Sequence, residues 1–108
     1  MAFVPYHNVS GSTGVDVELI APKSGVGNIK SILITNTHAS AAATVTLFLE
    51  DDPTAAAASI YKILSLKTIP RNDYLLLDNE SMINFDNNTY GLYVTVGSSD
   101  TLDIMINT

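Results

Sequence analysis

The chain has 108 residues, no cysteine and a formal net charge of −6 at pH 7. The missing thiols exclude disulfides and thiolate metal ligands, and the negative charge, which repels phosphate groups and anionic lipid, argues against direct binding to nucleic acid or to a membrane surface. Hydrophobic residues make up 46% of the sequence and charged residues only 15%, below the roughly 25% typical of globular domains, so we expect much of the apolar surface to lie in contacts with other chains.

The first 14 residues are predicted to form an extended arm, and the domain itself is predicted to span residues 15–108. Pro5 argues against a central strand, although residues 3–6 could pair as a short edge strand. Residues 10–14 are serine, glycine and threonine only, a composition typical of flexible linkers. Because the arm has neither the basic region nor the apolar run of a signal peptide, we expect a soluble protein that is not exported by a cleaved signal.

Beyond the arm, apolar and polar residues alternate with the period of two that is typical of β-strands. Eight segments are predicted to be strands: residues 15–20, 31–35, 44–50, 60–69, 74–77, 82–85, 90–96 and 102–106. Turn residues separate them at roughly ten-residue spacing, and no long segment has helical periodicity, which predicts an all-β fold. The predicted architecture is a single antiparallel β-sandwich or jelly-roll-like domain of about eight strands.

Two connections leave alternatives open. The polar residues 36–40 favour a turn, which could close a hairpin or carry the chain from one sheet to the other. Residues 51–58 combine Asp-Asp-Pro-Thr with an alanine run, so either one helical turn or a surface loop is expected there.

The inward-facing members of the alternating strands are expected to form the core. They are Val45, Leu47, Leu92, Val94 and Ile104. In the segment 60–69, Leu64 and Leu66 are expected to share one face. The polar face of segment 30–50 carries Leu33 and Phe48 among its threonines, two large apolar side chains that a fully solvated face would not need.

Apolar side chains on otherwise polar strand faces are the candidate contacts with other chains. We expect self-association or docking through Phe48, Tyr93 and Met105, with Phe3 and Val4 of the arm as additional anchors. Burial of a large side chain is worth roughly 1.5–3 kcal/mol, so a few such residues offset much of an association cost of ~4–15 kcal/mol.

No residue pattern predicts catalysis or a cofactor. The sequence has no G-x-S-x-G nucleophile motif and no glycine-rich phosphate loop, so an enzyme is not expected. Asp51-Asp52 and residues 78–80 offer clustered oxygens but lack the spaced carboxylates and glycine of a calcium loop, so we interpret them as solvated turns. His7 and His38 have no companion ligand nearby in the sequence and are interpreted as exposed polar residues.

An aromatic platform for sugars is an alternative use of the aromatic side chains. Five residues could supply amphipathic rings: Tyr61, Tyr74, Tyr90, Tyr93 and Phe48. The sequence has no tryptophan, and these rings are scattered over several strands. Packing in the core or at an interface is therefore the main expectation for them.

Three segments, taken in order, resemble the small β-sandwich virion proteins of tailed bacteriophages: IKSILITNTHASAAATVTLFLED, IYKILSLKTIPRNDYLLLD and INFDNNTYGLYVTVGSSDTLDIMI. A strand that ends in I-x-N-T, a V-x-L strand and a late Y-x-L-x-V strand carry the resemblance, which covers residues 29–107. It implies a non-enzymatic structural protein without cofactors: a capsid decoration or cement protein that stabilises the head by bridging capsomers, or else a neck, tail or fibre attachment component.

The resemblance also implies partners and a location. The expected partners are the major capsid protein or other virion proteins, together with further copies of the chain, with a trimer favoured. The expected location is the outer surface of the capsid, after synthesis in the host cytoplasm. A carbohydrate-binding module, such as one on a host-recognition fibre, is the rival expectation.

Overall fold

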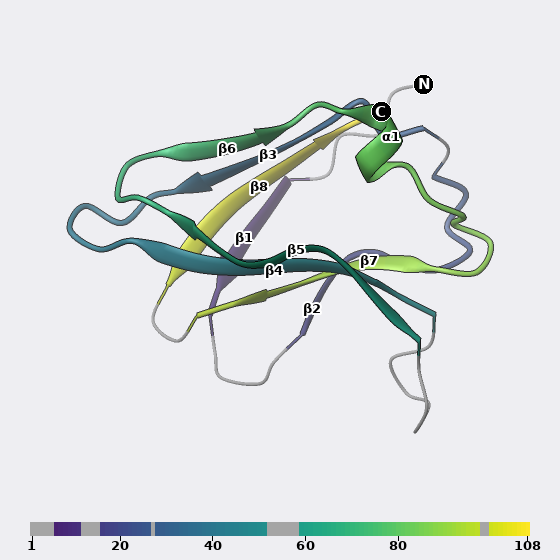
Figure 1. Ribbon diagram of the computed structural model, residues 1–108, viewed down its shortest axis with the longest axis horizontal. Coiled ribbons are helices and arrows are strands. Elements are labelled where there is room, and N and C mark those ends of the chain that lie inside the picture. Colours follow the sequence, from purple (N-terminus) through teal and green to yellow (C-terminus); the bar gives the residue numbers. More distant parts are fainter. Residues whose placement is uncertain (1–5, 12–15, 27, 52–58, 98–99) are drawn as a thin grey trace.

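The computed structural model describes residues 6–11, 16–26, 28–51, 59–97 and 100–108. These residues form eight β-strands and one short helix (Figure 1). The strands are β1 (Tyr6–Ser10), β2 (Val17–Ile20), β3 (Ser31–Asn36), β4 (Ala43–Glu50), β5 (Ile60–Ile69), β6 (Tyr74–Leu77), β7 (Gly91–Val96) and β8 (Thr101–Asn107). The helix α1 (Glu80–Ile83) lies between β6 and β7.

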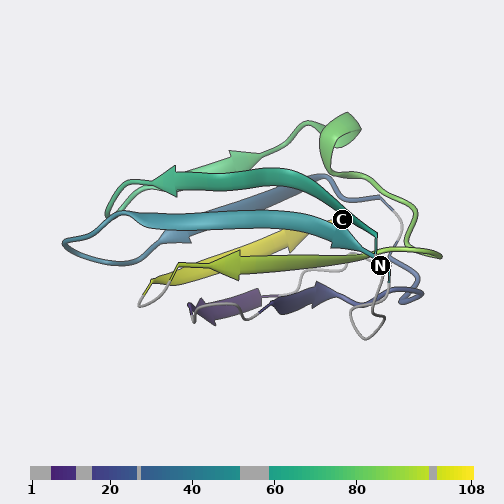
Figure 2. The same cartoon turned by 60° about the horizontal axis from the view of Figure 1, so that its bottom comes forward.

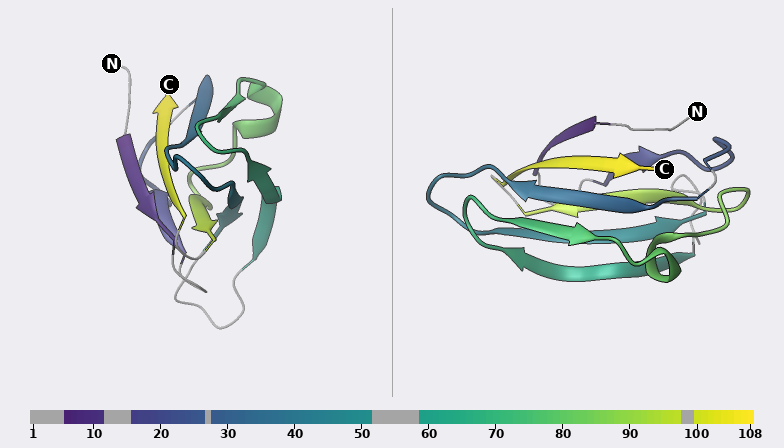
Figure 3. Two further views of the ribbon diagram at one scale, coloured as in Figure 1. Left: turned by 90° about the vertical axis from the view of Figure 1, so that its left-hand side faces the viewer. Right: turned by 90° about the horizontal axis from the view of Figure 1, so that it is seen from above.

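The strands form two four-stranded antiparallel sheets that pack face to face (Figure 2 and Figure 3). Sheet A has the order β1-β8-β3-β6, and sheet B has the order β2-β7-β4-β5. The pairs β1 with β8, β2 with β7, β3 with β6 and β4 with β5 are all hydrogen-bonded. The chain is thus folded back on itself like one long hairpin, with its tip between β4 and β5, and wrapped into two layers. This is a jelly roll, and the predicted fold class is confirmed.

The connection after β3 crosses from sheet A to sheet B, so it does not close a hairpin. The buried Asn36, at the end of β3, holds this crossing in place. Its side-chain amide donates to the carbonyl groups of Ala41 and Ile69, each at 3.0 Å, and its Oδ1 accepts a 3.0 Å hydrogen bond from the N–H of His38. Because Ile69 ends β5, one side chain joins the β3–β4 crossing to the β5–β6 crossing.

The core lies between the two sheets and consists of aliphatic side chains from both. The five residues expected there are fully buried: Val45, Leu47, Leu92, Val94 and Ile104. They come from β4, β7 and β8, in which these alternate residues turn inward. This part of the core prediction is confirmed.

One correction concerns the N-terminal arm. Tyr6–Ser10 does not lie outside the sandwich: it forms β1, which pairs with β8 at the edge of sheet A. Val9 of this strand is buried in the core. The predicted domain boundary at residue 15 is therefore wrong. A strand is favoured before residues 10–14 because Val9 can be buried in the core and because the backbone N–H and C=O groups at the edge of β8 need hydrogen-bond partners.

A second correction concerns residues 82–85, for which the alternation predicts a strand. The chain forms α1 here instead, and its N-cap is Asn79, whose side chain accepts a 3.1 Å hydrogen bond from the N–H of Ser81. One helical turn also directs Ile83 into the core. An asparagine cap followed by an acidic residue is a helix-start signal, and it prevails over a short apolar alternation. Residues 52–58, where one helical turn or a loop is expected, lie outside the described residues.

A third correction concerns β5, in which Leu64 and Leu66 do not share a face. The pairing of β4 with β5 shifts register close to Leu47. Leu66 has a φ of 51°, a left-handed conformation that is uncommon for leucine, and its N–H donates to Oγ1 of Thr46 at 3.0 Å. Leu64 therefore packs against the core, whereas the side chain of Leu66 is exposed.

Candidate functional site

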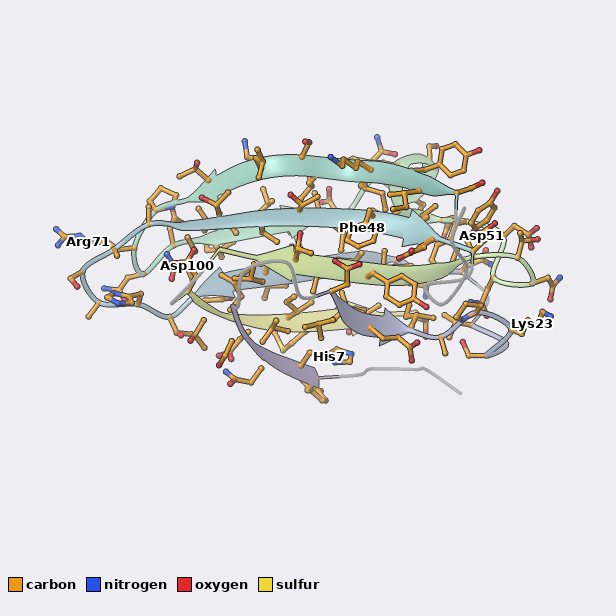
Figure 4. All side chains as sticks on the ribbon, turned by 90° about the horizontal axis from the view of Figure 1, so that it is seen from below. His7, Lys23, Phe48, Asp51, Arg71 and Asp100 are labelled. Carbon is orange, nitrogen blue, oxygen red and sulfur yellow. The ribbon has the colours of Figure 1, made fainter. Side chains whose placement is uncertain are left out.

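The predicted interface residues lie on two different sheets. Phe48 projects from sheet B on the face opposite the core (Figure 4), and Tyr93, its cross-strand partner, shares that face. Met105 is half-buried on the outer face of sheet A. Phe3 and Val4 lie outside the described residues, so the structure does not test them.

Phe48 and Tyr93 are buried within the chain rather than free for a partner. They face each other across β4 and β7, and their ring centroids are 6.0 Å apart at an interplanar angle of 24°. The Tyr93 hydroxyl donates to the carboxylate of Glu18 at 3.3 Å. Only 4% of Phe48 and 2% of Tyr93 is exposed, so neither ring offers much apolar surface to a second chain.

The outer face of sheet A, by contrast, carries a row of apolar side chains across all four strands. The strand register places Tyr6 opposite Met105, Met105 opposite Leu33, and Leu33 opposite Leu76. All four point away from the core, because their neighbours along each strand point inward. Tyr6 is 73% exposed and Leu76 48% exposed, while Leu33 and Met105 are half-buried between them. We call these four residues the sheet A row.

Polar side chains border the sheet A row on both sides. On one side, two residues from Tyr6 and Met105, Asn8 donates to the carboxylate of Asp103 at 2.7 Å. On the other side, two residues from Met105 and Leu33, Asn107 donates to the hydroxyl of Ser31 at 3.1 Å. At the β1–β8 end of the row, the surface contains a 330 Å³ hollow. It is lined by Tyr6, His7, Asn8, Asp103, Ile104 and Met105. The row is therefore an apolar stripe within a polar surface.

The sequence pattern predicts only part of the sheet A row. It predicts Met105 as an interface residue and Leu33 as an apolar side chain on a polar face. It does not single out Tyr6, because the pattern places that residue in an arm, or Leu76, because the apolar run 74–77 has no alternation. The four residues are aligned by the register of the paired strands, which the sequence alone does not reveal.

A second surface lies at the end of the sandwich where the β2–β3 connection meets the turn before β7. The buried Asn87 joins the two segments. Its Oδ1 accepts hydrogen bonds from the N–H groups of Gly25 at 2.9 Å and Val26 at 3.2 Å. Its Nδ2 donates to the carbonyl groups of Ala21 at 3.0 Å and Tyr90 at 3.1 Å. This side chain fixes the loops on which the surface is built.

The Tyr90 side chain at this end packs against another ring. The centroids of Tyr61 and Tyr90 are 5.7 Å apart, and the rings meet edge to face at 85°. The pKa of Tyr90 is raised, first by loss of hydration and then by Tyr61, Asp51 and Asp86. The Tyr90 hydroxyl therefore stays protonated and remains a hydrogen-bond donor at neutral pH.

The two histidines have different environments. His38 is exposed, as expected, and its Nδ1 accepts hydrogen bonds from the N–H groups of Ser40 and Ala41, each at 3.0 Å. His7 is not an exposed residue: it points inward from β1, and its Nε2 is buried with no hydrogen-bond partner among the described residues. Burial lowers the pKa of His7 below its ordinary value of 6.5, partly opposed by a hydrogen bond with the backbone of Leu19.

The acidic segments considered for calcium have local structural contacts. Asp51 accepts a 2.8 Å hydrogen bond from the N–H of Ser59, and Asn79 caps α1. Within the described part of the chain, no three His, Cys, Asp or Glu side chains are grouped so that they could hold a metal ion. Nor does this part of the chain contain a helix that is long and apolar enough to cross a membrane.

Comparisons with protein families, curated proteins and solved structures found no match to this chain.

Proposed function

We propose that this protein is a non-enzymatic virion structural protein, of the capsid decoration or cement type, that stabilises a phage head by bridging capsomers. Its contact with the shell is the sheet A row: Tyr6, Met105, Leu33 and Leu76. The observation that carries the proposal is the alignment of these four apolar side chains across all four strands of one sheet. The resemblance of residues 29–107 to small phage virion proteins supports the choice of partner, the major capsid protein.

The geometry of the sheet A row suits attachment to a flat protein surface. Neighbouring strands are about 4.8 Å apart, so the row extends over about 14 Å between its two outer strands. Full burial of a large apolar side chain contributes roughly 1.5–3 kcal/mol. Because Leu33 and Met105 are already half-buried, most of the gain comes from Tyr6 and Leu76.

Charge favours a protein partner over a lipid or nucleic-acid partner. The chain has eleven acidic residues and five lysines and arginines. Asp103 lies directly beside the sheet A row, where it repels anionic headgroups and phosphates. An apolar stripe bordered by neutral and acidic side chains complements an apolar protein surface with a neutral or basic rim.

The location of the protein tests the proposal directly. Virus particles purified from the source of this sequence are analysed by mass spectrometry and by immunogold labelling. We expect the protein on the outside of the head, with a copy number that follows the symmetry of the capsid lattice. A copy number that follows the symmetry of the neck or tail supports the alternative attachment role, and absence from the particles refutes a virion function.

Rebinding to particles stripped of the protein tests the sheet A row. Leu76→Ser is compared with Ile60→Ser, since Ile60 is 49% exposed, nearly the same as Leu76, but lies on sheet B. We expect Leu76→Ser to weaken rebinding about tenfold and Ile60→Ser to leave it unchanged. Equal rebinding of both variants excludes the row as the contact. Multi-angle light scattering of the free protein measures the predicted self-association, for which a trimer is favoured.

A further inference from the structure

An open hollow lies at the end of the sandwich that Asn87 organises. It has a volume of 620 Å³. Its lining comes from the β2–β3 connection, the end of β4 and the turn before β7: Pro22, Lys23, Asp51, Asn88 and Thr89. Lys23 and Asp51 lie at this end in Figure 4, away from Arg71 at the opposite end. The hollow is therefore separate from the sheet A row, which crosses the middle of a sheet face.

An aromatic pair lies near the hollow, beyond the described residues that form its lining. Tyr90 directly follows Asn88 and Thr89, two residues of the lining. The Asp51 carboxylate, also in the lining, is among the groups that raise the pKa of Tyr90. Tyr61 meets Tyr90 edge to face, and more than half of Tyr61 is exposed. An exposed tyrosine ring thus contacts Tyr90, the residue that follows the turn, and the hollow at that turn presents carboxylate, amide, hydroxyl and ammonium groups.

The lining is fixed before any ligand arrives. Asp86 accepts hydrogen bonds from the N–H of Asn88 at 3.0 Å and from the hydroxyl of Thr89 at 2.9 Å. Asp51 is held by the N–H of Ser59, and Asn87 ties the β2–β3 connection to the same turn. Groups that are already ordered lose little conformational entropy on binding, so a shallow site can still bind a ligand.

We propose that this hollow binds an uncharged saccharide, with the Tyr61 ring against the apolar face of the sugar. A pyranose has C–H groups on one face and hydroxyl groups around its rim, which matches an amphipathic ring beside polar side chains. The Asp51 carboxylate accepts from sugar hydroxyls, the Asn88 amide both donates and accepts, and Lys23 donates. Asp51 and Asp86 at this end, and the net charge of −6, disfavour sialylated or sulfated sugars.

The structure also selects among the rings considered from the sequence. Phe48 and Tyr93 are buried against each other on sheet B, and Tyr74 stands on the outer face of sheet A. Tyr61 and Tyr90 meet close to the turn that lines the 620 Å³ hollow, and Tyr61 is more than half exposed. Tyr74 therefore serves as a matched control, because it is 64% exposed and Tyr61 is 58% exposed.

The test is a ¹H–¹⁵N NMR titration of the whole chain with uncharged probes: maltotriose, cellotriose, mannotriose, lactose and chitotriose. We expect at least one of them to shift the amide signals of Lys23, Asn88 and Thr89 in a saturable way. Tyr61→Ala is expected to weaken that binding about tenfold, while Tyr74→Ala leaves it unchanged. Circular dichroism confirms that both variants are folded.

Three outcomes overturn the proposal: no shift with any probe at millimolar concentration, shifts confined to other surfaces, or equal affinities for Tyr61→Ala and the parent. The titration also distinguishes saccharide binding at this hollow from attachment through the sheet A row. Leu76→Ser is expected to keep saccharide binding while its attachment to particles weakens about tenfold, so either function can fail without the other.

Discussion

Asn36 and Asn87 are buried at opposite ends of the sandwich, and each binds backbone groups from two separate loops. Asn36 joins the β3–β4 and β5–β6 crossings, and Asn87 joins the β2–β3 connection to the turn before β7. A jelly roll has to carry its chain between sheets at both ends, where backbone groups lack strand partners. In this protein a single amide at each end supplies many of those missing hydrogen bonds.

Replacing either asparagine should therefore destabilise the fold strongly. Asn36→Ala and Asn87→Ala each leave several loop donors and acceptors without partners, and each such group costs about 1–3 kcal/mol when it stays buried. We expect a loss of at least about 3 kcal/mol in the free energy of unfolding, measured by urea denaturation. Asn28→Ala, at an exposed position in the β2–β3 connection, is the control and is expected to change stability by less than about 0.5 kcal/mol.

Phe48→Ser is expected to act on folding rather than only on association. The ring stacks on Tyr93 and is almost fully buried, so its removal should lower the free energy of unfolding by at least about 2 kcal/mol. The control is Ile60→Ser, because Ile60 lines the same hollow of sheet B as Phe48 but is half-exposed. Thermal melts of the two variants measure the difference. Superimposable melts of Phe48→Ser and the parent would contradict the packing described for this face.

Acidification should weaken the sandwich through His7. Its pKa is lowered in the folded state by burial, so below about pH 6.5 the unfolded chain binds a proton that the folded chain does not. Stability therefore falls as the pH drops below about 6.5, until the pKa of the folded state is passed. We expect His7→Gln to flatten this part of the stability curve, measured by urea denaturation between pH 7 and pH 5. An unchanged slope in His7→Gln rules out this origin.

Alternation in the sequence was sufficient to predict the fold class and the core. Val45, Leu47, Leu92 and Val94 lie in strands that are buried on their inner face, where period-two patterning is strongest. It failed for α1, because one turn of helix also places Ile83 inward and the decisive group is the Asn79 cap. It failed for β1 because the strand is short and only Val9 marks its inner face.

The candidate sites were harder to predict because they depend on pairing. Leu33 and Leu76 are more than 40 residues apart in the sequence and become neighbours only through the β3–β6 register. Phe48 and Tyr93 are apolar residues on polar faces, like Met105, yet they cover each other because β4 pairs with β7. No pattern within one strand distinguishes a ring that meets a cross-strand partner from one that stays exposed.

The pairing of β1 with β8 also sets an order of events during synthesis. The first described strand cannot find its partner until the last one has been made, so the nascent chain holds β1 without its sheet. The β4–β5 pair, whose strands are close in the sequence, closes a much shorter loop and has the lower entropic cost. Assembly on the ribosome is therefore expected to begin at the tip of the long hairpin and to end with β1, so His7 is buried, and Tyr6 takes its place in the sheet A row, in the last step.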